Sequence, residues 1–174
     1  MTIRRYKDIS PSIAQSAYID ESAVVIGDVH IGEDSSLWPM VVARGDVNSI
    51  RIGARSNIQD GSVLHVTHAH PEVPAGHPLL IGDEVTVGHH VTLHGCRIGN
   101  QCLIGMGSII LDGAQIHDRV YIGAGSLVPP GKELEGGYLY LGQPVKRTRE
   151  LSEQEIARFH YSALHYIKIK NAYR

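Results

Sequence analysis

The sequence of 174 residues has no excess of basic residues, no long apolar run and no closely paired cysteines. Its 16 lysines and arginines are outnumbered by 18 aspartates and glutamates, so nucleic acid is not expected as a partner. No apolar run approaches the roughly 18 residues of a membrane span, and the N-terminus lacks the apolar core of a signal peptide. We therefore expect a cytoplasmic protein that acts on small or neutral molecules, with no membrane partner.

An aliphatic residue recurs at every sixth position along most of the chain, and this period is the signature of a parallel β-helix. The 18 lead positions, at three hexads per triangular coil, predict six coils whose flat sides are short strands with alternating inward and outward side chains. The inward lead residues are Ile13, Ile19, Val25, Ile31, Leu37, Ala43, Ile52, Ile58, Leu64, Ile81, Val87, Leu93, Ile98, Ile104, Ile110, Ile116, Ile122 and Val128.

A small side chain stands two positions before most lead residues, and this slot also points inward. Cys96 and Cys102 both occupy it, six residues apart, which is not the spacing of a C-x-x-C metal or redox site. We therefore expect two reduced thiols buried in the core. Glycine follows many lead residues, as at Gly32 and Gly82, where we expect a corner that needs unusual backbone angles.

The period is interrupted at three places. The step from Leu64 to Ile81 equals one hexad plus an insertion of eleven residues, rich in histidine and proline, which should project as a loop at about 66–79. Shorter slips follow Ala43 and Leu93. After Val128, prolines and glycines are expected to close the β-helix, so that 1–145 form the β-helix domain and 146–174 a C-terminal helix of the same domain.

A capping box at Ser152-Glu153-Gln154-Glu155 predicts where that helix begins. Apolar residues then recur at helical spacing, which favours an amphipathic helix of about four to five turns that packs back along the coils. The residues of its apolar stripe are Ile156, Phe159, Ala163 and Ile167.

His65 and His94 each follow a lead residue directly, so both occupy the same outward slot. Their separation equals the insertion plus one full coil, which predicts that they stack on adjacent coils about 4.8 Å apart. Modest convergence would bring their nitrogens to about 3.3 Å, as two ligands of a tetrahedral zinc require. His89 lies in a different slot and should point off another side of the prism, so it could complete the site from a neighbouring subunit. A three-histidine site with an open fourth position is catalytic rather than structural.

Three motifs connect this pattern to a known family: Arg44-Gly45-Asp46, the run from Asn57 to His65 that reads NIQDGSVLH, and the run from Gly88 to Gly95 that reads GHHVTLHG. With them the chain resembles the gamma-class carbonic anhydrases and their bacterial YrdA-like relatives over nearly its whole length. The resemblance implies an all-β fold, a left-handed parallel β-helix with a C-terminal α-helix packed alongside. It also implies a homotrimer with metal sites at the subunit interfaces.

The same resemblance implies a zinc ion, with iron or cobalt as other divalent metals that the site can hold. His65 and His94 would come from one subunit and His89 from the next. The implied activity is that of a lyase, the reversible hydration of carbon dioxide to bicarbonate by a metal-bound hydroxide. Other implied site residues are Arg44 and Asp46 as an ion pair near the metal, Gln59 as a hydrogen-bond partner of the metal-bound water, Asp60 in the same motif, and Tyr161 as an active-site tyrosine.

The chain departs from the archetypal family pattern at Val47 and His68, which stand where that pattern has glutamates. Valine cannot carry a proton, whereas His68, with His70, could export one. His68, His70 and His77 could instead form a second metal site or a polar surface loop. Three other functions stay open: an acyl thioester hydrolase, a hexapeptide acyltransferase with a single histidine base and a coenzyme A groove, and a trimeric metal-binding or scaffold protein without catalysis.

Overall fold

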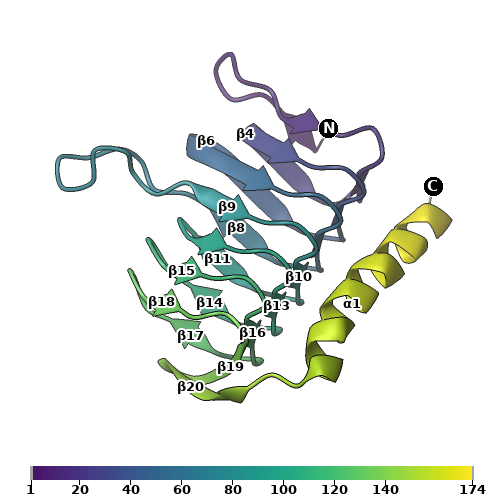
Figure 1. Ribbon diagram of the computed structural model, residues 1–174. Helices are drawn as coiled ribbons and strands as arrows, with labels where there is room; N and C mark the ends of the chain where they lie inside the picture. Colours follow the sequence, from purple (N-terminus) through teal and green to yellow (C-terminus); the bar gives the residue numbers. More distant parts are fainter. Residues whose placement is uncertain (1, 174) are drawn as a thin grey trace.

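The computed structural model describes residues 2–173, which form a parallel β-helix with one α-helix alongside (Figure 1). The predicted fold, a β-helix of hexapeptide repeats with a C-terminal helix, is confirmed. Successive coils stack through parallel pairing of strands, most of them only two or three residues long. No helix in the described part of the chain is long and apolar enough to cross a membrane.

The coils present three flat faces, which we name after the strands β8, β9 and β10 of one coil. Two long strands, β4 (Val24–Ile31) and β6 (Val42–Ile52), pass through a corner and belong to both the β8 and the β9 face. The β8 face also contains β1 (Ile3–Arg4), β8 (Val63–His65), β11 (Thr92–His94), β14 (Ile109–Ile110) and β17 (Leu127–Val128). The β9 face contains β2 (Ser12–Ile13), β9 (Leu79–Ile81), β12 (Arg97–Ile98), β15 (Gln115–Ile116) and β18 (Glu133–Leu134). The β10 face contains β3 (Tyr18–Ile19), β5 (Ser36–Leu37), β7 (Asn57–Ile58), β10 (Thr86–Val87), β13 (Leu103–Ile104), β16 (Tyr121–Ile122) and β19 (Tyr138–Gly142).

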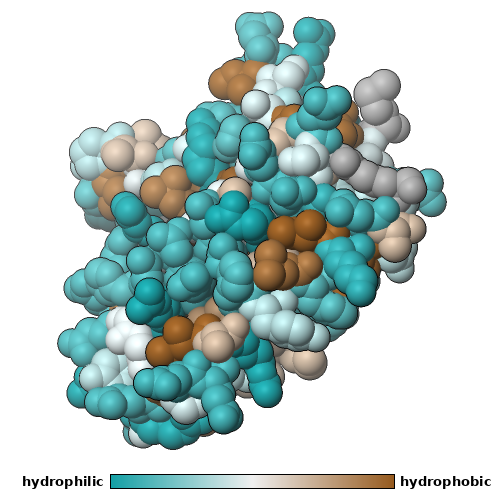
Figure 2. Space-filling model, turned by 45° about the vertical axis from the view of Figure 1, so that its right-hand side comes forward, coloured by the Kyte–Doolittle hydropathy of each residue, from teal (hydrophilic) through white to brown (hydrophobic). Residues whose placement is uncertain are grey.

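The lead residues form the core, as predicted, and nearly all of them are fully buried. Cys96 and Cys102 are buried free thiols in the same core, and burial raises the pKa of Cys102 to about 12. The repeat does not close after Val128, because Leu134 and Tyr140 continue it in β18 and β19. Gly142 and Pro144 lie where the parallel repeat ends, but the prolines and glycines before them occupy corners between hexads: Pro129, Pro130, Gly131, Gly136 and Gly137. On the outside, Figure 2 shows small separate hydrophobic patches among hydrophilic residues.

The glycines after the lead residues are required by close packing, not by unusual backbone angles. Neither Gly32 nor Gly82 has a positive φ; the left-handed conformation falls two residues later, on Asp34 and Glu84. A Cβ atom on Gly32 would lie 2.7 Å from the carbonyl carbon of Gly53 in the next coil. The expected reason for these glycines was therefore wrong, since the neighbouring coil leaves no room for a side chain.

All three interruptions of the repeat fall at one corner, between the β8 and β9 faces. There β6 carries the first slip, the insertion joins β8 to β9, and the shortened step joins β11 to β12. The insertion is a hairpin with antiparallel bridges between Thr67 and His77 and between His70 and Val73. It projects from the stack of coils (Figure 1). Its base is tied to β6 because Asn48 Nδ2 donates to the carbonyl oxygens of Thr67 and Ala75.

After the last coil, β20 (Val145–Glu150) pairs antiparallel with β19, and helix α1 (Glu153–Ala172) follows. The predicted capping box at Ser152 is present and starts the helix. The helix lies along the β10 face, with Phe159 and Ala163 buried against it (Figure 1). Residues 1 and 174, the outer limits of the two predicted segments 1–145 and 146–174, lie outside the described residues.

Candidate metal centre

His65 and His94 meet at the corner between the β8 and β9 faces, which we call the His65 corner. They are direct neighbours in the register of β8 and β11. Their nitrogens, Nδ1 of His65 and Nε2 of His94, lie 3.0 Å apart. Two ligands of a tetrahedral zinc at 2.0 to 2.1 Å need a separation of about 3.3 Å. The pair therefore has the geometry of two ligands on one edge of a metal site.

A carboxylate holds the second nitrogen of each of these rings. Nε2 of His65 lies 3.2 Å from Oδ1 of Asp46, and Nδ1 of His94 lies 2.5 Å from Oδ1 of Asp112. An N–H bond to a carboxylate fixes the tautomer of a neutral imidazole and leaves the other nitrogen free to bind a metal. The donor set thus fits a divalent metal such as zinc at the nitrogens that face each other.

The electrostatics of this corner favour neutral imidazole and charged carboxylate. Burial lowers the pKa of His65, and the nearby Arg44 and His94 lower it further. Burial acts to raise the pKa of Asp46, but hydrogen bonds from Arg44 and His65 outweigh it and leave that pKa below its usual value. Arg44 Nη1 and Asp46 Oδ2 form an ion pair at 2.5 Å, as the resemblance implies.

His89 stands at a different corner, between the β10 and β8 faces, which we call the His89 corner. Its Nδ1 lies 3.0 Å from Oδ2 of Asp60 on the preceding coil, and Gln59 directly precedes Asp60. All three histidines therefore have one ring nitrogen against a carboxylate. Across residues 2–173, no three His, Cys, Asp or Glu side chains are arranged to hold a metal ion. The described residues therefore place the His65 and His94 pair and His89 at two separate corners of the chain.

The β8 face joins these two corners. The outward side chains directly before its lead residues form a stripe that is apolar apart from one threonine. They are neighbours in the register of successive coils. Within the stripe, Val63 is 42% exposed and Ile109 is 41% exposed. The stripe comprises Val24, Val42, Val63, Thr92, Ile109 and Leu127. Contiguous exposed apolar patches mark interaction sites on protein surfaces.

Two further predicted residues lie outside these contacts. Tyr161 is on α1, 65% exposed, and its ring stacks on that of His165 at 5.9 Å between centroids. His68 is exposed on the hairpin, with its ring 5.7 Å from that of His70. Its neighbour Thr67 reaches the His65 corner, because Oγ1 of Thr67 donates to Oδ2 of Asp112 at 2.7 Å.

Asp112 and Thr67 were not among the site residues predicted from the sequence. Asp112 follows His94 by 18 residues, whereas register neighbours on β11 and β14 are 17 residues apart, so counting coils alone does not bring it to the ring. Burial acts to raise the pKa of Asp112, but hydrogen bonds from His94 and Thr67 outweigh it and lower that pKa. A continuous chain of contacts results, ordered Arg44, Asp46, His65, His94, Asp112 and Thr67.

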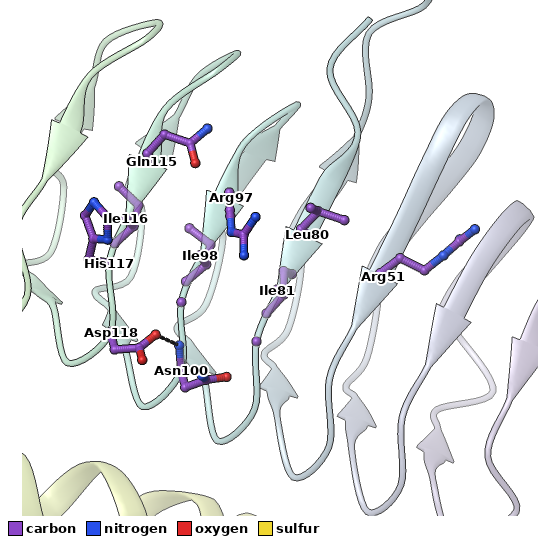
Figure 3. Close-up of a pocket in the computed structure, with 12 residues that line it drawn as sticks. Arg51, Leu80, Ile81, Arg97, Ile98, Asn100, Gln115, Ile116, His117 and Asp118 are labelled. Atoms are coloured by element: carbon purple, nitrogen blue, oxygen red, sulfur yellow. Dashed lines mark hydrogen bonds between the residues drawn. The ribbon is translucent and has the colours of Figure 1, made fainter. Parts of the chain in front are cut away.

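A groove on the β9 face is separate from this site. It has a volume of about 240 Å³, and Leu80, Arg97 and Gln115 project beside it from successive coils (Figure 3). None of the predicted site residues lines it. A second hollow, of about 310 Å³, does include Asp46, together with Tyr6, Ile9 and Val47.

Comparison with known proteins places this architecture in a family. Residues 95–130 match the family model described as bacterial transferase hexapeptide (six repeats). The chain is 61% identical to Protein YrdA of Escherichia coli over 171 residues, 98% of this chain and 93% of that protein. It is 48% identical to a protein named carbonic anhydrase from Geobacillus kaustophilus over 151 residues, 87% of this chain and 79% of that protein.

A solved structure agrees with this assignment at the level of the fold. A hexapeptide transferase family protein from Anaplasma phagocytophilum superposes with a TM-score of 0.92 at 39% identity, covering 99% of this chain and 98% of that one. The fold and the paired histidines are those of a hexapeptide-repeat β-helix protein with a candidate metal centre. Within that class, the chain belongs to the YrdA-like members of the gamma-class carbonic anhydrase family.

Proposed function

We propose that the protein is a homotrimer that catalyses the reversible hydration of carbon dioxide to bicarbonate at a divalent metal, with zinc as the first candidate. His65 and His94 of one subunit and His89 of the next would hold the metal. The observation that carries the proposal is the His65 and His94 pair, with facing nitrogens 3.0 Å apart and a carboxylate against the other nitrogen of each ring. The similarity to carbonic anhydrases supports the reaction.

The position of the two half-sites supports the trimer. They occupy the two corners that border the β8 face, and this face carries the exposed apolar stripe. In a cyclic assembly, one edge of each subunit meets a different edge of the next. Packing the β8 faces around a threefold axis would bury the stripe and bring the His65 corner of one subunit to the His89 corner of its neighbour.

The residues of the chain have distinct tasks in this proposal. Bound zinc would supply hydroxide at neutral pH, because it lowers the pKa of its water to about 7. Asp46, Asp112 and Asp60 each accept a hydrogen bond from one histidine and so orient the ring. Gln59 directly precedes Asp60, which contacts His89, and the resemblance assigns it the task of orienting the attacking oxygen. His68 would take up the proton released by each turnover.

Complementation between two inactive variants tests whether the site is shared. His65→Ala and His89→Ala should each abolish metal binding and hydration. Trimers assembled from an equal mixture of the two should recover about a quarter of the sites, since each mixed trimer has one junction with all three ligands. The matched control mixes His65→Ala with His94→Ala, whose lesions lie in the same half-site, and should stay inactive. A mixture of the first pair without metal or activity would refute the shared site.

Metal content and stopped-flow hydration of carbon dioxide test the reaction itself. We expect three metal ions per trimer and hydration that is lost on chelation and restored by zinc. Three metals without hydration would favour an acyl thioester hydrolase, for which the same metal chemistry would serve, or a metal-binding role without catalysis.

A hexapeptide acyltransferase is the second candidate, favoured by the likeness to the transferase family protein from Anaplasma phagocytophilum. It would need no metal and only one histidine as base. Transfer of an acyl group from coenzyme A that persists in the presence of a chelator and in His65→Ala would support this candidate and contradict the first.

A further inference from the structure

A buried chain of hydrogen bonds connects helix α1 to Gln59 beside the His89 corner. Ser162 Oγ on α1 lies 2.9 Å from Thr86 Oγ1 on β10. Asn57 Nδ2 donates to Thr86 Oγ1 at 3.0 Å, and Gln59 Nε2 donates to Asn57 Oδ1 at 3.1 Å. Asn57, Thr86 and Gln59 are all buried. Four side chains thus lie in one series that starts on the helix and ends at the candidate site.

The direction of these bonds determines which end of the Gln59 amide is free. Because Asn57 gives its N–H to Thr86, its oxygen is left to accept from Gln59. The nitrogen of Gln59 is therefore tied back into the series, and its oxygen is the end left to accept from a group in the site. Gln59 also directly precedes Asp60, which contacts His89. A free amide in solution would present either end equally.

We propose that Thr86 and Ser162 are positioning residues for the hydration reaction. Acting through Asn57, they hold the amide of Gln59 with its oxygen towards the metal-site water that the proposed function requires. This inference rests on the proposed function, and it gives α1 a task beyond covering the β10 face. The resemblance assigned a role on α1 to Tyr161 only, whereas Ser162 is the helix residue that connects by hydrogen bonds to the Gln59 motif.

Thr86→Val tests the inference, because valine keeps the shape of threonine and removes the hydroxyl group. We expect kcat to fall about threefold to tenfold, the rate equivalent of one neutral hydrogen bond, with the metal content and the trimer unchanged. Thr86→Ser should restore the rate. In a Gln59→Ala background, Thr86→Val should cause no further loss, since both changes act through the same group. Wild-type kcat in Thr86→Val, or full additivity with Gln59→Ala, would overturn the inference.

A control variant separates positioning from helix docking. His160 lies two residues before Ser162 on α1 and contacts Glu84 with Nδ1 at 3.0 Å, outside the series. His160→Ala therefore removes a comparable contact between helix and coil but should leave kcat unchanged, whereas Ser162→Ala should lower it like Thr86→Val. Equal losses in the two helix variants would mean that the series matters only for docking.

A measurement on metal-free protein decides the inference even if hydration is absent. The side-chain NH₂ protons of Gln59, assigned by their disappearance in Gln59→Glu, should exchange with water more slowly than those of an exposed glutamine. Thr86→Val should speed this exchange, and His160→Ala should not. If the wild type shows slow exchange that Thr86→Val abolishes, but no hydration, the positioning role stands and the proposed reaction is rejected. Fast exchange in the wild type would reject the positioning.

Discussion

His94 and Asp112 lie on successive coils, with Nδ1 of the imidazole 2.5 Å from Oδ1 of the carboxylate. The other oxygen of Asp112 accepts a hydrogen bond from Thr67 at the base of the hairpin. The carboxylate is thus held from both sides, and it fixes the plane of the ring that carries a candidate ligand nitrogen. The hairpin that interrupts the repeat is in this way connected to the candidate metal centre.

Asp112→Asn should weaken metal binding about 10-fold to 100-fold, because an amide fixes the tautomer and orientation of His94 less well than a carboxylate. Competition with a chromophoric chelator measures the affinity. Asp83→Asn serves as the control, since Asp83 uses Oδ1 to accept from a backbone N–H and an amide oxygen can do the same. Unchanged affinity in Asp112→Asn would exclude the proposed role.

Val63→Lys should break the proposed trimer, because it places a charge in the middle of the apolar stripe of the β8 face. Sedimentation should then give a species near the monomer mass of 19.0 kDa, and the metal should be lost with the interface. Leu80→Lys is the matched control, an aliphatic residue in the equivalent outward slot of the β9 face, and should leave the assembly intact. A trimer that survives Val63→Lys would show that another face joins the subunits.

Counting along the sequence predicted part of this site and could not predict the rest. Subtracting the insertion places His65 and His94 in matching slots, and they are neighbours in the register. A period reports which coil a residue occupies, however, and not which oxygen it turns towards a neighbour. The contact of Asp112 with His94 could therefore not be predicted without the orientation of the His94 ring, which only the structure gives. Likewise, Leu134 and Tyr140 continue the core despite the surrounding prolines and glycines, because those residues fit the corners.

The metal-free protein should lose stability as the pH falls from 7 towards 5. Burial lowers the pKa of His65 in the folded state. At a pH between that folded pKa and the unfolded pKa near 6.5, His65 is protonated in the unfolded chain but not in the folded one. The stabilising contribution is therefore present above about pH 6.5 and is lost as the pH drops through the folded pKa. In His65→Gln, the free energy of unfolding obtained from thermal unfolding should depend less steeply on pH. The difference in slope should correspond to at most one proton, or about 1.4 kcal/mol per pH unit. Equal slopes in both proteins would contradict this.

His68→Ala should slow hydration in weak buffer and not in strong buffer. His68 is an exposed imidazole next to Thr67, whose hydroxyl contacts Asp112 at the site, and its ring lies 5.7 Å from His70. Histidine changes its charge near neutral pH, so it can pass a proton from the site to the solvent when buffer is scarce. A concentrated imidazole buffer would replace that task and restore kcat. His117→Ala, which removes a similarly exposed histidine whose Nε2 contacts Glu133 on the β9 face, is the control and should match the wild type in both buffers. If His68→Ala also keeps the wild-type rate in weak buffer, the proton leaves by another route.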